Sequence, residues 1–114
     1  MRATIQQIQS LVHKGVSELS IIDSKKTKVK PAPDKWSKKE ILGHLIDSAL
    51  NNHQRCVRAG YNDAKEFPAY DQKEWVRIQY YNELSWHDMI RFWNDLNQHL
   101  CHVIKCLPEE GQSA

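Results

Sequence analysis

Apolar residues recur at three- and four-residue steps through the first twenty residues of the chain. The members of this series are Ile5, Ile8, Leu11, Val12, Val16 and Leu19. Such spacing places apolar side chains along one stripe of an α-helix. The pattern predicts a helix from about Thr4 to Ile22, with His13 on the opposite side and in solvent. Pro31 and Pro33 prevent any helix from continuing beyond this segment.

A capping box marks the start of a second predicted helix. Glu40 follows Ser37 by three residues, so each side chain can bond a free backbone N–H of the first turn. Trp36 precedes the cap and can pack against Ile41 as a hydrophobic staple. Gly60 ends the helix. Its apolar residues cover about half of the circumference: Ile41, Leu42, Leu45, Ile46, Ala49, Leu50, Cys56 and Val57.

Polar residues line one edge of this apolar arc. The edge stripe consists of His44, Ser48, Asn51 and Arg55, each one turn from the next. A histidine at this border can point its ring into the mouth of a helical bundle and bind a metal. Spacing alone leaves a structural role and a metal-binding role for His44 equally open. Asn52 and His53 fall inside the arc and need hydrogen-bond partners if they are buried.

Two more capping patterns predict two further helices. Asp71 with Glu74 opens a short helix, and Ser85 with Asp88 opens a last long helix that Pro108 ends. The apolar face of the last helix is wide: it carries Met89, Ile90, Phe92, Trp93, Leu96, Leu100, Val103, Ile104 and Leu107. We therefore expect an all-α helical bundle of three long helices plus a short one.

The 114 residues form one predicted domain, residues 1–114. Each long helix has an apolar face wide enough for more than one neighbour, which favours a missing fourth helix or a second subunit. A net charge of +2 is too small to indicate nucleic acid. No apolar run approaches the ~20 residues that cross a membrane.

Three cysteines, Cys56, Cys101 and Cys106, form no CxxC pair, and the N-terminus does not resemble a secretory signal. This predicts a cytoplasmic protein with buried thiols. Cys101 and Cys106 lie within a helix without visible electropositive activation, so nucleophilic catalysis by cysteine is not supported. The chain also lacks a Gly-rich phosphate loop and a nucleophile elbow.

The remaining histidines give weaker metal signals than His44. His99 and His102 are three residues apart and lie off the main apolar face of the last helix, so we expect them in solvent or at a rim. His87 follows a cap and should be exposed. The chain contains no HExxH motif.

An ordered set of short sequence words resembles the DinB/YfiT-like superfamily of four-helix bundles. The words are WS at 36–37, GHLIDSA at 43–49, NNHQR at 51–55, YDQKEWV at 70–76, QYY at 79–81 and WNDLN at 93–97. No single word is specific to this superfamily, but the order of the words is. The match covers nearly the whole chain. The resemblance implies an up-down bundle with a divalent metal, commonly zinc or nickel, held by three histidines.

In that family the first ligand comes from the His-Leu-x-Asp word of the second helix, which is His44 here. The other two ligands form an HxxxH pair on a later helix, and this sequence contains no such pair. Six residues follow Pro108, so we expect that helix to be absent and a homodimer to complete the bundle. A dimer that pairs two His44 side chains, with His53 as an additional ligand, would bind metal weakly.

Related proteins use the metal to activate water or a low-molecular-weight thiol, which implies a metal-dependent hydrolase or thiol S-transferase. Four residues would then orient the metal ligand or a small-molecule substrate: Asp47, Ser48, Asn51 and Arg55. The alternative is a non-catalytic helical module that keeps the fold, lacks the metal site and dimerises or interacts through its uncovered apolar faces.

Overall fold

The computed structural model describes residues 2–61 and 69–107, and every regular element in these ranges is helical. The elements are α1 (Arg2–Ser20), η1 (Ser24–Lys26), α2 (Lys38–Gly60), α3 (Gln72–Gln79), η2 (Tyr81–Glu83) and α4 (Trp86–Cys106), where η marks a 3-10 turn. The predicted all-α fold with three long helices and a short one is confirmed. None of these helices is long and apolar enough to cross a membrane.

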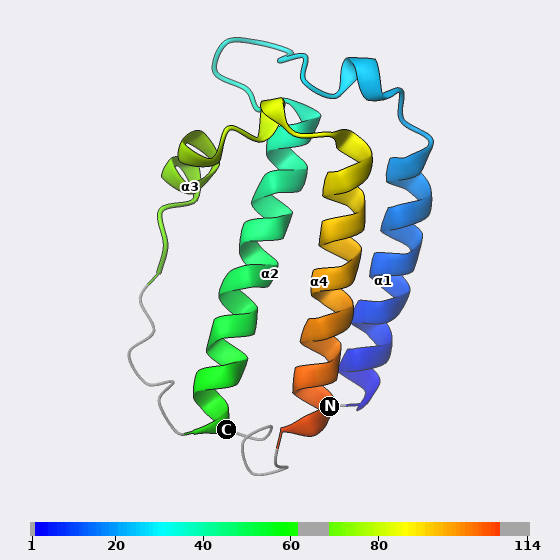
Figure 1. Cartoon of the computed structure of the whole chain (residues 1–114), viewed down its shortest axis with the longest axis vertical. Helices are drawn as coiled ribbons and strands as arrows, with labels where there is room; N and C mark the ends of the chain where they lie inside the picture. Colours follow the sequence, from blue (N-terminus) through cyan, green and yellow to red (C-terminus); the bar gives the residue numbers. More distant parts are fainter. Residues whose placement is uncertain (1, 62–68, 108–114) are drawn as a thin grey trace.

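The three long helices lie side by side, with α4 between α2 and α1 (Figure 1). The extensive packing runs from α4 to each neighbour, and α3 and η2 pack on α2. Because α1 and α2 both pack mainly on α4, the described helices form a layer in which α1 and α2 each keep a face that no other described helix covers.

The hydrophobic core lies at the end of the layer where α4 begins. Its buried members come from α2, α3, η2 and α4: Leu42, Ile46, Val76, Tyr81, Trp86, Met89 and Ile90. The C-terminal part of α1 packs against this cluster through half-buried Val16 and Leu19. The indole nitrogen of Trp86 donates to the Leu19 carbonyl at 3.1 Å. This bond satisfies the one polar atom of the buried Trp86 side chain.

All three predicted helix caps are present. Ser37 Oγ accepts from the Glu40 backbone, and the Glu40 side chain accepts from the Ser37 backbone, which completes the capping box. Ser37 Oγ also donates to Asn82 Oδ1 at 2.6 Å and so joins the start of α2 to η2. Asp71 caps α3 and Ser85 caps α4 as predicted.

The predicted apolar stripes are only partly buried. Leu11 is 69% exposed on α1, and Ile41 and Leu45 are 48% and 40% exposed on α2. These side chains lie beside the buried face of each helix, and in residues 2–61 and 69–107 their neighbours leave them largely exposed. Periodicity identifies an apolar face, but the neighbouring elements decide how much of that face is buried.

Other differences are local. The first helix ends at Ser20 rather than Ile22, because Asp23 caps η1 by accepting from the Lys25 backbone. Asn52, predicted inside the apolar arc, is exposed at its edge. The predicted loop through Pro68 and the stop at Pro108 with its tail fall outside the described residues.

The expectation of buried thiols holds for one cysteine only. Cys101 is buried, Cys56 is half-buried and Cys106 is exposed. Burial raises the pKa of both the Cys56 and Cys101 thiols above the usual 9.0. Cys106 differs because it lies in the last turn of α4, on the side away from the core.

Gly43 generates the first prediction. A Cβ at this position would lie 2.1 Å from Tyr81 Cδ2 and would therefore overlap the buried tyrosine ring. Alanine stabilises a helix interior by about 1 kcal/mol relative to glycine. At position 43 this gain is opposed by overpacking against the Tyr81 ring, which costs roughly 1–3 kcal/mol and displaces the ring. We predict that Gly43→Ala lowers the free energy of unfolding measured with urea.

Gly60→Ala is the matched control, because its Cβ would meet only the flexible end of Leu107 at 3.1 Å. This variant should unfold close to wild type. A Gly43→Ala protein as stable as Gly60→Ala would contradict the observed packing of Tyr81 on α2.

Candidate functional site

A buried carboxylate stands at the junction of α2 with the α3–η2 segment. Asp47 has 0% exposure, and its Oδ1 accepts from Tyr81 Oη at 2.5 Å and from Gln79 Nε2 at 2.8 Å. Tyr80 makes this possible: its left-handed backbone, with φ of 51°, ends α3 and turns the chain back toward α2. Two donors from outside the helix therefore hold one oxygen of Asp47 in place.

Tyr81 acts in this network as a neutral hydrogen-bond donor. Burial is the main cause that raises the pKa of its hydroxyl above 10.0, and the hydrogen bond to Asp47 and the charge of Asp47 raise it further. The proton therefore stays on the tyrosine at neutral pH, and Asp47 Oδ1 accepts the hydrogen bond.

Two buried polar atoms in this region have no hydrogen-bond partner among the described residues. They are Asp47 Oδ2 and His44 Nδ1. Buried polar groups are paired in the great majority of cases, so an unpaired one indicates a water, an ion or another ligand. The two residues are three positions apart on α2 and so are neighbours on one side of the helix.

The ring of Trp36 covers one side of His44, with ring centroids 5.4 Å apart and planes tilted by 34°. Trp36 is half-buried in the segment that leads into α2 and also packs on the core. The imidazole is thus placed between a fixed aromatic ring and the helix that carries Asp47. An imidazole nitrogen and a carboxylate oxygen are donor types that zinc accepts.

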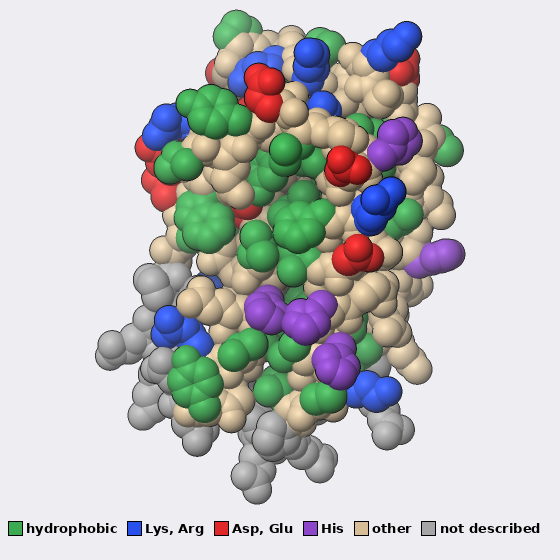
Figure 2. Space-filling model, in the orientation of Figure 1, with side chains coloured by type: hydrophobic (Ala, Val, Ile, Leu, Met, Phe, Trp, Pro, Cys, Tyr) green, Lys and Arg blue, Asp and Glu red, His purple; other side chains and the backbone are tan. Residues whose placement is uncertain are grey.

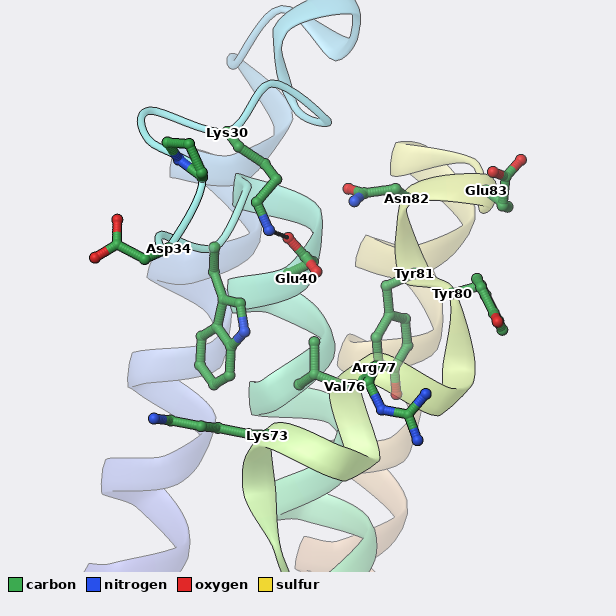
Figure 3. A pocket seen from close by; sticks show the side chains of 12 residues that line it. Lys30, Asp34, Glu40, Lys73, Val76, Arg77, Tyr80, Tyr81, Asn82 and Glu83 are labelled. Carbon is green, nitrogen blue, oxygen red and sulfur yellow. Dashed lines mark ion pairs between the residues drawn. The ribbon is translucent and has the colours of Figure 1, made fainter.

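A cavity of about 420 Å³ opens next to Trp36. Trp36 forms part of its wall. So do the apolar and aromatic side chains of Val76, Tyr80 and Tyr81 (Figure 3). Charged side chains surround it: Lys30, Asp34, Glu40, Lys73, Arg77 and Glu83. Small-molecule sites usually occupy about 300–1,000 Å³, so this cavity has room for a small ligand.

Three of the charged residues around this cavity are already paired within the protein. Lys30 Nζ lies 3.6 Å from Glu40 Oε1 (Figure 3). Arg77 Nε donates to Glu74 Oε2 at 2.5 Å, and this carboxylate raises the pKa of the Arg77 guanidinium. The cavity therefore combines an apolar wall with a mixed and partly compensated ring of charge.

The rest of the predicted edge stripe lies along a second hollow. Ser48, Asn51 and Arg55 line a cavity of about 290 Å³ together with Tyr70, and the Ser48 and Tyr70 hydroxyls are 3.0 Å apart. The buried Asn51 side chain donates to the Asp47 carbonyl at 2.8 Å. The structure therefore brings three stripe residues together, but the wall of this hollow does not include His44.

The remaining histidines are placed in two different ways. His13 and His87 are exposed, as expected. His53 is half-buried, and its ring lies against that of His99 on α4, with centroids 5.1 Å apart. Sequence reasoning missed this contact, although the position of His53 in the arc of α2 that faces α4 was a signal for it.

His53 lies nine residues beyond His44, which is about 13 Å along the helix axis. Within one subunit the two side chains do not meet at one metal ion. No three His, Cys, Asp or Glu side chains in residues 2–61 and 69–107 are grouped so as to hold a metal ion. A metal at His44 therefore needs ligands beyond those of the described residues.

Comparison of the chain with protein-family models, with curated proteins and with solved structures finds no match.

The Asp47 network generates a prediction about stability. Tyr81→Phe keeps the ring but removes one donor to a buried carboxylate, which costs roughly 1–3 kcal/mol. Tyr80→Phe alters the exposed neighbouring tyrosine and should leave the free energy of unfolding unchanged. Urea unfolding at neutral pH compares the two variants, and equal stability would show that the Tyr81–Asp47 hydrogen bond is not formed.

The raised pKa of Tyr81 predicts a pH dependence as well. Above pH 10.0 the unfolded chain releases this proton while the folded chain retains it, so this stabilisation is complete below pH 10.0 and is lost at higher pH. Wild type should therefore lose stability above pH 10.0 more steeply than Tyr81→Phe. Parallel slopes for the two proteins would contradict this coupling.

Proposed function

We propose that this chain is a DinB-like metal-dependent enzyme, a hydrolase or thiol S-transferase, whose metal is held by His44 and by ligands from a second subunit. The observation that carries the proposal is the pair of buried atoms without partners, His44 Nδ1 and Asp47 Oδ2. Leaving polar atoms unpaired in an interior is costly, and a hydrogen bond between these two residues, formed when a metal holds the His44 ring, would remove that cost.

Asp47 would orient the imidazole. Histidines that bind metals usually donate their second ring N–H to a carboxylate, which fixes the ring and its tautomer. Asp47 keeps Oδ2 available for this bond because Tyr81 and Gln79 occupy Oδ1. Rotation of the His44 ring so that Nδ1–H donates to Oδ2 would present Nε2 to a zinc or nickel ion.

A bound divalent ion would lower the pKa of a water or thiol ligand and polarise the group that it attacks. Catalytic zinc sites generally have three protein ligands and one open position. His44 supplies one of these ligands, and in our proposal a second copy of the chain provides the rest. A cavity of about 420 Å³ has room for a low-molecular-weight substrate such as a small thiol; its wall includes Trp36, whose ring contacts His44, but neither His44 nor Asp47.

A second candidate is a non-catalytic helical module whose role is dimerisation. Exposed apolar side chains on three helices support this candidate: Leu11, Ile41, Leu45, Val57 and Phe92.

Metal content tests the first candidate. We predict that the purified chain, loaded with zinc or nickel and desalted, retains metal that His44→Ala loses, because His44 is the proposed ligand. His13→Ala is the matched control, since His13 is exposed on α1. Elemental analysis of the three proteins measures the metal per chain. Equal metal in wild type and His44→Ala would contradict the proposal.

Mass in solution tests the subunit interface that both candidates require. We predict that wild type is a dimer and that Leu45→Glu is a monomer, because a charge would lie on the exposed apolar side of α2 beside His44. Asn52→Glu, an exposed polar position on the same helix, should remain dimeric. Light scattering after size exclusion gives the masses.

A monomeric wild type would contradict the dimer and with it both candidates. A stable dimer that holds no metal after loading would exclude the first candidate and support the second. Circular dichroism of Leu45→Glu controls for loss of helix.

A further inference from the structure

A second group of histidines lies on the face formed by α2 and α4, away from His44. Figure 2 shows neighbouring histidine side chains over these two helices. The ring of His53 on α2 is 5.1 Å from that of His99 on α4, and His99 is 6.1 Å from His102. We propose that His53 and His99 form a binding site for a divalent transition metal that bridges α2 and α4, with His102 as a third ligand.

The spacing of the first two rings suits a shared ion. When two imidazoles bind one tetrahedral zinc ion through bonds of about 2.0–2.1 Å, their ring centres lie roughly 5 Å apart. The 5.1 Å between His53 and His99 meets this requirement across the helix interface. His102 follows His99 by three residues, so its ring extends the same surface of α4 by one turn.

The donor set also selects the class of metal. Imidazole suits zinc, nickel and copper, whereas magnesium and calcium prefer oxygen ligands. The exposed Sγ of Cys106 lies 3.9 Å from His102 Nε2, which adds a soft donor at the edge of the group. In residues 2–61 and 69–107 no three His, Cys, Asp or Glu side chains are already grouped so as to hold a metal ion. The smallest form of the proposed site is therefore the His53–His99 pair. His102 becomes a third ligand when its side chain rotates.

A metal bound here would cross-link two helices. His53 and His99 belong to the halves of α2 and α4 that follow the buried cluster of Leu42, Ile46 and Met89. The unfolded chain does not hold the two imidazoles together, so the ion binds the folded state preferentially and stabilises it. The site is therefore structural in kind, in contrast to the proposed role of His44.

Zinc titration by calorimetry tests the site on the full chain. His99→Gln is the main variant because His99 is exposed, so its replacement should preserve the fold. We expect it to weaken zinc binding by about tenfold or more, which corresponds to about 1.4 kcal/mol. His87→Gln, an exposed histidine on the same helix, is the matched control and should bind as wild type does.

His44→Ala separates this site from the proposed function. It should leave zinc binding at His53–His99 intact, and His99→Gln should leave the metal at His44 intact. Failure of either proposal is therefore visible while the other stands. Zinc affinity in His99→Gln equal to that of His87→Gln would overturn the present inference.

Thermal unfolding gives an independent readout. The comparison is made in the His44→Ala background, which removes any effect of zinc at His44. Zinc should raise the unfolding midpoint of His44→Ala and of His44→Ala with His87→Gln, and magnesium should not. The zinc-induced rise should be absent in His44→Ala with His99→Gln. An equal rise in the two double variants would show that the stabilising ion lies elsewhere and would also overturn the inference.

Discussion

The arrangement of one end of this molecule depends on the buried carboxylate of Asp47. A buried carboxyl group is costly unless it is hydrogen bonded, and Tyr81 and Gln79 supply the bonds to Asp47 Oδ1 when the chain folds. Gly43 leaves the space that the Tyr81 ring occupies. This requirement holds α3 and η2 against α2, and the cavity beside Trp36 is formed between these elements and the segment before α2.

Local signals in the sequence were sufficient for the helices and their starts. The capping patterns at Ser37, Asp71 and Ser85 involve residues only three positions apart, and all three caps formed. Contacts between distant residues were not predictable in this way. Asp47 and Tyr81 are 34 residues apart, and the buried fraction of Leu45 depends on which helices lie beside α2. The position of His44 at the edge of the apolar arc indicated a possible metal ligand. That its Nδ1 is buried without a hydrogen-bond partner is visible only in the folded structure.

The two histidine groups differ in ways that match different roles. His44 is partly buried, lies under an aromatic ring and is close in sequence to a fixed carboxylate, an environment suited to orienting a reactive metal. His53 and His99 meet across two helices, and His99 is exposed, which suits a stabilising cross-link. The open layer of α2, α4 and α1 connects these features, because it leaves the apolar side of α2 available to a second subunit.

The most direct test of the central claim is a long-range ¹H–¹⁵N NMR spectrum of the histidine side chains during titration with zinc. It reports the tautomer and the metal bond of each imidazole separately. Our account predicts that the His44 ring nitrogens shift as zinc binds, while those of His13 and His87 stay unchanged. Unaltered His44 signals at saturating zinc would contradict the proposed metal site.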